Sequence, residues 1–200
     1  MTKLGVRTVE TDDFSFVDGS IISKGGKRTP YRLLVEGKVE NKVQLSYQEL
    51  LALPSVTQTS DFHCVEGWSV PDLVWKGFRF AEIVRLAKPR PDAHYVIFHA
   101  LGETEHEPHG QNHYIECLPV THLLDSGKEC LLTLKMNGNP LPQEHGAPLR
   151  VIAPYDLAYK SIKFVYKIEF SSEEKSGWWT LANPIYPRHA PVPASRLRRK

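Results

Sequence analysis

Short β-type segments recur along most of this chain, and single short helical segments are scattered between them. Segments rich in β-branched and aromatic residues, such as 56–64 and 95–100, outnumber segments with helical spacing. A doubly wound sheet would require strands and helices to alternate regularly. The pattern therefore predicts an α+β fold with mixed β-sheets and scattered short helices.

Local signals define several of these elements. Ser46 followed by Glu49 is a capping-box pattern that opens a helix, and Pro54 ends that helix. Asn137-Gly138 follows an apolar segment and is a strong hairpin signal. Residues 161–170 carry apolar positions throughout and are expected to form one strand.

The chain divides into three parts by composition. Residues 1–30 are polar and irregular, and are expected to form an N-terminal arm laid over a core. Residues 31–176 are expected to form the catalytic domain. Residues 177–200 form a tail rich in aromatic residues and proline that ends in a basic cluster, and this tail either packs on the domain or on a second subunit.

Charge and composition exclude some classes of function. The 200 residues suffice for one substantial core, and a net charge of +2, with nine histidines counted as neutral, is too small to indicate a nucleic-acid partner. No apolar run approaches the ~20 residues needed to span a membrane. The N-terminus carries no export signal, so we expect a cytoplasmic protein. Its three cysteines give no disulfide framework.

Cys64 ends an extended segment and begins a loop that runs through Gly67 and Trp68 toward Phe78. Three interpretations compete. A buried structural thiol is the commonest state of a single cysteine. A nucleophile would need a nearby base, but adjacent His63 points to the opposite face of a strand. A lone thiolate could instead bind a soft metal that is held mainly by a cofactor. From these residues alone, the structural thiol is favoured.

A second segment, residues 145–163, has the composition of an anion-binding site. Glycine and proline flank a short strand that carries Arg150, and a following turn presents Lys160, Ser161 and Lys163. Arginine offers a planar fork, lysine a point charge, and a serine hydroxyl a further donor to a phosphate. Surface lysines on a strand edge are the alternative, but Arg150 precedes apolar residues, so an arginine there requires a partner.

The two segments together resemble the oxidoreductase molybdopterin-binding family, which includes sulfite oxidase and the bacterial methionine sulfoxide reductase catalytic subunit. The resemblance covers about residues 30–170. Residues 64–69 look like the metal-ligand segment of that family, residues 145–150 like its cofactor-binding segment, and residues 160–163 like its closing phosphate-binding turn. The order and spacing of these pieces make the resemblance specific. It implies a sulfite-oxidase-type molybdopterin-binding fold.

The resemblance also implies the cofactor and its ligands. The family holds one molybdenum through the dithiolene of one pyranopterin and through one cysteine thiolate, which by position is Cys64, the catalytic and metal-binding residue. His99 lies where a polar residue often contacts the cofactor, although the residue pair there departs from the family pattern. The other residues that fall at cofactor-binding positions are His145, Arg150, Lys160, Ser161, Ile162 and Lys163.

The implied activity is that of a molybdopterin-dependent oxidoreductase of the sulfite oxidase type, catalysing oxygen-atom transfer on a small sulfoxide, sulfur or nitrogen oxide substrate. The chain carries no haem or flavin signature, so a separate electron-transfer protein or carrier is expected. Val65, Glu66 and Gly67, rather than arginines, follow Cys64, and the charge of Glu66 would oppose a sulfite dianion if it faced the pocket. The histidine-rich residues 102–113 form either a substrate funnel or a solvated loop.

Three alternatives belong to other classes. A cysteine hydrolase or transferase would use Cys64 as nucleophile with a histidine as base, and would bind no molybdenum. A non-catalytic module would bind the pterin without redox cycling. A nucleic-acid binder would use the basic residues 196–200, whereas a basic tail is usually a solvated end.

Overall fold

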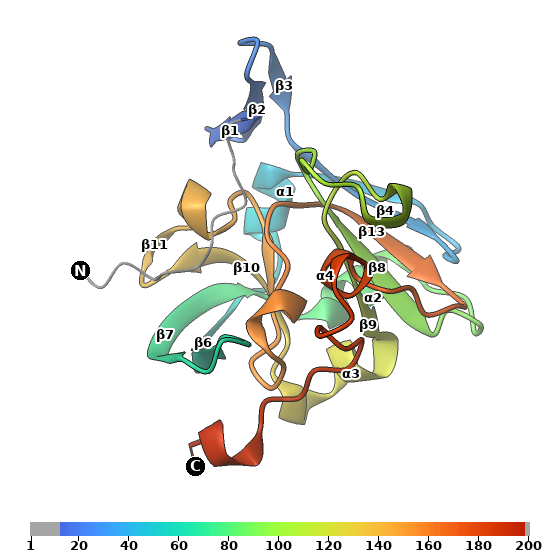
Figure 1. Cartoon of the computed structure of the whole chain (residues 1–200). Helices are drawn as coiled ribbons and strands as arrows, with labels where there is room; N and C mark the ends of the chain where they lie inside the picture. The colour runs from blue at the N-terminus through green and yellow to red at the C-terminus, as the bar shows by residue number, and fades with distance from the viewer. Residues whose placement is uncertain (1–12, 199–200) are drawn as a thin grey trace.

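The computed structural model describes residues 13–198 and contains two five-stranded sheets and one three-stranded sheet within that range. Short helices lie singly between the strands (Figure 1). This arrangement is the α+β organisation, with mixed sheets and scattered short helices, that the sequence predicts. No helix of the described residues is both long and apolar enough to cross a bilayer.

The central sheet has the strand order β5-β4-β13-β8-β9. It is mixed because β13 runs parallel to β4, while its other pairings are antiparallel. Its inner face carries side chains with less than 2% exposure, including Val96, Phe98 and Phe170. The strands are β4 (Arg32–Gly37), β5 (Val43–Ser46), β8 (Tyr95–Ala100), β9 (Ile115–Pro119) and β13 (Val165–Ser171).

The second sheet has the order β11-β10-β7-β6, with β12 pairing on β10. Its longest strand, Ser69–Phe78, occupies residues for which the sequence indicates only a loop. Pro71 argues against a strand in the sequence, because proline has no backbone N–H to donate to a neighbouring strand. In the structure it lies beside an irregularity in the pairing, where such a residue is tolerated. The strands are β6 (Val56–His63), β7 (Ser69–Phe78), β10 (Leu131–Met136), β11 (Asn139–Pro140) and β12 (Arg150–Ile152).

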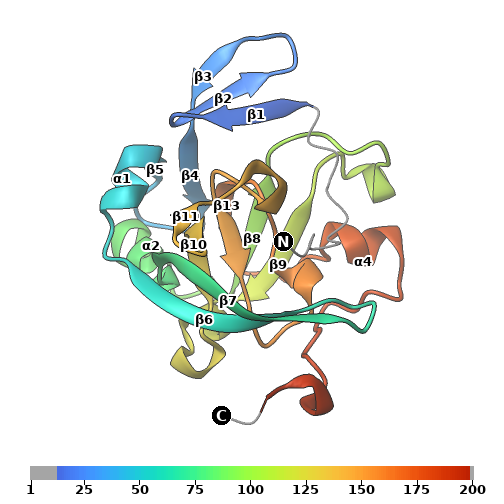
Figure 2. The ribbon, with the colours of Figure 1, turned by 90° about the vertical axis from the view of Figure 1, so that its left-hand side faces the viewer.

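The N-terminal segment is more regular than expected. Residues 14–30 form a separate antiparallel sheet at one end of the molecule (Figure 2). Phe14 anchors this sheet to the core, since its ring meets Phe164 edge-on at 5.4 Å. The sequence conceals these strands because most of their side chains are exposed, so no buried period appears. The strands are β1 (Phe14–Val17), β2 (Ser20–Ser23) and β3 (Arg28–Pro30).

The helices are short. The predicted capping box is confirmed, since the Ser46 side chain accepts from the Glu49 N–H and the Glu49 carboxylate accepts from the Ser46 N–H. The predicted strand over residues 161–170 is wrong at its start: Phe164 has a φ of 58°, so residues 161–164 form a turn and β13 begins at Val165. The helices are α1 (Tyr47–Ala52), α2 (Phe80–Ala87), α3 (Val120–Leu124) and α4 (Trp178–Ala182).

Gly77 lies where the backbones of β7 and β10 come into close contact. A Cβ at this position would lie 1.9 Å from the carbonyl oxygen of Leu132 and 2.7 Å from the Cα of Thr133. Both contacts are with backbone, so a flexible side chain cannot move aside. The irregular pairing just after Thr133 brings the two backbones together here.

We predict that Gly77→Ala lowers the free energy of unfolding by roughly 2 kcal/mol or more, because the strands must separate to admit the methyl group. Urea denaturation of the purified protein measures the change. Gly25→Ala is the matched control, since nothing lies within 4 Å of its Cβ position. Equal stability of the two variants would contradict the role given to Gly77.

Candidate functional site

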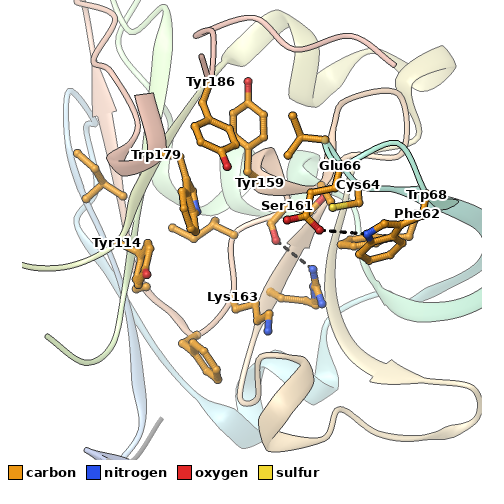
Figure 3. Close-up of a pocket in the computed structure, with 17 residues that line it drawn as sticks. Phe62, Cys64, Glu66, Trp68, Tyr114, Tyr159, Ser161, Lys163, Trp179 and Tyr186 are labelled. Atoms are coloured by element: carbon orange, nitrogen blue, oxygen red, sulfur yellow. Dashed lines mark hydrogen bonds between the residues drawn. The ribbon is translucent and has the colours of Figure 1, made fainter. Parts of the chain in front are cut away.

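A cavity of about 140 Å³ lies between the tip of the β6–β7 hairpin, the segment 145–163 and the C-terminal tail (Figure 3). It brings together residues that are far apart in the sequence. Five of the predicted site residues line it: Cys64, Arg150, Ser161, Ile162 and Lys163. The other lining residues are Phe62, Val65, Glu66, Trp68, Ala100, Tyr114, Ile115, Ala158, Tyr159, Phe164, Trp179 and Tyr186.

Cys64 lies in the tight turn of the β6–β7 hairpin. Its N–H donates to the carbonyl of Trp68 at 2.9 Å, and Gly67, with a φ of 96°, allows the chain to reverse. The thiol is half-buried, and this burial raises its pKa. The two other cysteines, Cys117 and Cys130, are buried in the protein and do not line the cavity.

Arg150 lies at the base of the cavity and contacts several of the segments that surround it. Its guanidinium donates to the carbonyl of His145 at 2.9 Å and to the carbonyl of Ser161 at 3.0 Å. It also lies over the rings of Phe62 and Trp75, at 5.3 and 5.4 Å. The side chain is fully buried, and burial lowers its pKa to about 9. Its fixed position follows from these neutral acceptors and rings.

Lys163 supplies a second buried cation. Its Nζ donates to the carbonyl of Glu144 at 2.9 Å, and its exposure is 8%. Burial, followed by the charge of Arg150, lowers the pKa of Lys163 to about 7. Nearby, the hydroxyl of Ser161 accepts from the Ala153 N–H at 3.0 Å and keeps its own proton for a further acceptor.

Neither of these two cations has a carboxylate partner among the residues that the structure describes. The hydrogen bonds of Arg150 and Lys163 go to carbonyl oxygens and both side chains lie over aromatic rings, while the Glu144 carboxylate attracts Lys163 from beyond ion-pair distance. Two unpaired cations at the base of one cavity are unfavourable unless an anion binds there. The arrangement therefore fits an anionic ligand, and a phosphate suits both donors.

Lys160 lies outside this cavity. Its Nζ contacts the Glu116 carboxylate at 2.5 Å and donates to the carbonyls of Cys117 and Arg188, at 2.9 and 2.8 Å. Both charged side chains are at most 3% exposed. The structure therefore assigns the charge of Lys160 to the junction between β9 and the turn, rather than to the lining of the cavity.

Two predicted histidines also lie outside the lining. His99 Nε2 lies 3.1 Å from a Glu169 carboxylate oxygen, and its Nδ1 lies 3.0 Å from His113 Nε2. Burial, followed by the charge of Lys167, lowers the pKa of His99 to about 4. His145 contributes its carbonyl to Arg150. The histidine-rich loop 102–113 likewise contributes no residue to the lining.

An aromatic wall was missed by the sequence reasoning. Tyr114, Tyr159 and two tail residues, Trp179 and Tyr186, line the cavity from three separate segments. The tail packs on its own domain, because Trp178 is 6% exposed and its ring lies 4.6 Å from that of Tyr114. The aromatic composition of residues 177–187 was the available signal, but it did not indicate which surface those rings would cover.

The basic tail holds the Cys64 turn in position. The guanidinium of Arg196 donates to the carbonyls of Cys64 and Trp68 and to the Ser69 hydroxyl, the first at 2.8 Å and the last at 3.0 Å. Arg198 pairs with Asp61 and Asp72, one on each strand of the hairpin. The expected solvated end is therefore bound to the hairpin over residues 196–198.

We predict that Arg196→Ala increases amide hydrogen exchange over residues 64–68 by about tenfold or more, because charge-assisted hydrogen bonds of this kind contribute about 1.5 kcal/mol or more. Metal-free protein suffices for the measurement. Arg90→Ala, an exposed arginine elsewhere on the surface, is the control. Unchanged exchange in this turn would show that Arg196 does not restrain it.

Sequence comparisons find related proteins. The family model for an oxidoreductase molybdopterin binding domain matches residues 22–179. The "uncharacterized oxidoreductase YuiH" of Bacillus subtilis (strain 168) is 35% identical over 151 residues, which cover 76% of this chain and 70% of YuiH.

A solved structure shares the fold. The sulfane dehydrogenase SoxCD from Paracoccus pantotrophus matches with a TM-score of 0.62 at 18% identity, covering 78% of this chain. The match covers 45% of the SoxCD chain, so this protein spans less than half of that chain's length. At this identity the likeness concerns the fold alone.

The predicted sulfite-oxidase-type fold is confirmed, and so is molybdopterin as the cofactor. The individual cofactor contacts stay predictions. The family match covers most of the chain, and the residues that it spans form both large sheets and most of the cavity lining. This chain belongs to the oxidoreductase molybdopterin-binding domain family.

Proposed function

We propose that this protein catalyses oxygen-atom transfer on a small, uncharged or cationic oxide, with one pyranopterin and its molybdenum held in the cavity beside Cys64. The observation that carries the proposal is the pair of buried cations, Arg150 and Lys163, which lack an anionic partner among the described residues. A cofactor phosphate would provide that partner. The family match supports an oxidoreductase, and the substrate type is our inference.

Different residues around the cavity would bind different parts of the cofactor. Arg150, Lys163 and the Ser161 hydroxyl would bind the phosphate at the base of the cavity, and the Cys64 thiolate would bind the metal at the hairpin turn. When bound, the cofactor supplies two-electron redox chemistry, and a separate carrier would return it to its starting state by single-electron steps. That carrier and the cytoplasmic location stay predictions.

The protein itself orients the ligand and keeps water out. Arg196 fixes the carbonyl of Cys64, which limits how far the thiolate can move from the cofactor. The rings of Trp68 and Phe62 cover one side of the cavity, and Trp179 with Tyr186 covers the other. A site enclosed by rings on two sides strengthens electrostatic interactions inside it.

Charge at the open end argues against a dianionic substrate such as sulfite. Glu66 is exposed at the cavity lining, and the described lining contains no arginine other than Arg150. The guanidinium of Arg150 already donates to two carbonyls. The described lining therefore offers a dianion no free cationic fork to receive it.

The alternatives fit the geometry less well. A cysteine hydrolase would need a base, but no histidine of the described residues lines the cavity, and His63 Nδ1 lies 2.8 Å from the Ser69 hydroxyl. A nucleic-acid binder would need a free basic tail, whereas Arg196 and Arg198 are paired within the protein. A non-catalytic pterin carrier is distinguished by the turnover measurement below.

We predict that Cys64→Ser retains the fold and the bound pterin but lowers turnover by more than about 100-fold, because a hard hydroxyl replaces the soft metal ligand. Circular dichroism, pterin content and turnover with a reduced dye and a dialkyl sulfoxide measure the three properties. Cys117→Ala, outside the cavity, is the control. Unchanged turnover in Cys64→Ser, or none in the loaded wild type, would refute the proposed activity.

We predict that Lys163→Met has opposite effects on the two states of the protein. Without cofactor it raises the free energy of unfolding by about 1 kcal/mol or more at pH 7, because a buried cation without an anionic partner is removed. The same variant retains less pterin, because the phosphate loses a partner. Chemical denaturation and pterin content measure these effects, and Lys76→Met, an exposed lysine, is the control.

The pH dependence of stability in the cofactor-free protein also tests whether Lys163 is a buried cation without an ion-pair partner. The folded-state pKa of Lys163 is depressed to about 7 from 10.5, so its protonation favours the unfolded chain. Stability should therefore rise as the pH increases from about 7 toward 10, and Lys163→Met should flatten that rise. An identical slope in the wild type and the variant would contradict the lowered pKa.

A further inference from the structure

The middle of the C-terminal tail is attached firmly to one wall of the cavity. After Tyr186, which lines the cavity, the backbone of residues 190–192 pairs with that of residues 155–157 through two hydrogen bonds of 2.7 and 2.9 Å. The side chains of Ala190 and Val192 are buried, at 2% and 5% exposure. Backbone pairing and burial together therefore fix this part of the tail.

The end of the tail, residues 193–198, is held in a different way. None of these six residues is buried. Two arginines attach the segment to the β6–β7 hairpin: Arg196 donates to the carbonyl of Cys64 at 2.8 Å, and Arg198 pairs with a carboxylate on each strand. Ion pairs exposed to water are weakened by salt and contribute little individually. The end of the tail is therefore easier to detach than the middle.

The hairpin presents two adjacent carboxylates to Arg198. Asp72 has a φ of 56°, and its N–H donates to Asp61 Oδ1 at 3.1 Å where the pairing of β6 with β7 is irregular. The guanidinium of Arg198 donates to Asp61 Oδ2 and to Asp72 Oδ1, both at 2.7 Å. A bulge of this kind redirects side chains, and here both carboxylates accept from one cation.

The hairpin that carries Cys64 projects beyond its sheet. Residues 75–78 of β7 pair with β10, whereas residues 69–73 pair with β6 in a two-stranded ribbon (Figure 2). A two-stranded ribbon is marginally stable by itself. Phe62 and Trp68 pack against the second hydrophobic cluster, and the two arginines of the tail add polar contacts. The position of the ribbon thus depends on contacts outside its own strands.

We propose that residues 193–198 form a latch that controls exchange of the cofactor. When closed, the latch ties the Cys64 hairpin to residues 155–157, which lead directly into the turn with Ser161 and Lys163. When the latch is released, the ribbon can move away from that turn and open the cavity to a pterin. The inference rests on the proposed function, because it requires the cofactor to lie between these two walls.

A latch differs from a direct binding contact in its effect on rates. Neither Arg196 nor Arg198 lines the cavity. A residue that binds the cofactor directly slows its release without slowing its loading. A latch that must open first slows both processes, so its loss accelerates both and changes the affinity much less than either rate.

Rates of pterin release and loading test the latch. Release is followed by the pterin that remains on the loaded full-length protein, and loading by the pterin that empty protein takes up from added molybdopterin. We expect Arg198→Met to raise both rate constants about threefold or more. Arg90→Met, at an exposed arginine elsewhere, should change neither. Faster release with unchanged loading, or no change in either rate, would overturn the latch.

The carboxylate partners give a second test. Asp72→Asn should accelerate pterin release in the wild type but add little in Arg198→Met, because both substitutions remove the same ion pair. In the cofactor-free protein, Arg198→Met should increase amide hydrogen exchange over residues 60–73 and leave the central sheet unchanged. Fully additive effects on release, or a uniform rise in exchange through the whole protein, would contradict the latch.

The latch and the proposed activity can fail separately. Cys64→Ser should lose turnover while its pterin release still responds to Arg198→Met. Faster exchange in Arg198→Met without turnover of any oxide by the loaded wild type would support the latch and refute oxygen-atom transfer. Turnover of a sulfoxide by the wild type, with the same exchange rates in the wild type and Arg198→Met, would support the activity and refute the latch.

Discussion

The guanidinium of Arg150 is the interaction on which the site depends. It joins the carbonyl of His145, before the strand, to the carbonyl of Ser161, after the turn, and it lies against Phe62 on the hairpin that carries Cys64. These segments are separated by about a hundred residues of sequence at their extremes. A full charge buried with neutral partners is costly, so its position is defined by every donor that it must satisfy. Under the proposed function, the cofactor phosphate offsets part of this cost.

Two neighbouring buried lysines have different partners. Lys160 and Lys163 are both buried and stand three residues apart. Lys160 is neutralised by Glu116 and connects the turn to β9, which makes it part of the framework. Lys163 donates to a carbonyl, lies over a ring and forms no ion pair, so under the proposed function its charge meets the cofactor phosphate. The left-handed backbone of Phe164 ends the turn and separates these residues from the strand that follows.

Much of the fold follows from local signals. The capping box at Ser46, the hairpin at Asn137-Gly138 and the strand over 95–100 depend on neighbouring residues, and each forms as expected. The strand at Ser69–Phe78 and the small N-terminal sheet escaped prediction. A proline interrupts the first, and most side chains in the second are exposed, so neither displays a clear alternation of buried residues. Their strand character comes from pairing with a partner, which sequence spacing does not encode.

The sequence by itself determined the chemistry of the cavity base. Cys64 at the end of an extended segment, the glycine and proline around Arg150, and the turn with Ser161 and Lys163 are all local features, and their order identified the family. Only the tertiary structure decided that Lys160 belongs to Glu116, that Arg196 restrains the Cys64 turn, and that rings from distant segments form the outer wall. Those facts depend on which surfaces meet. The shape and burial of distant segments determine which surfaces meet, and no fixed spacing along the chain encodes those contacts.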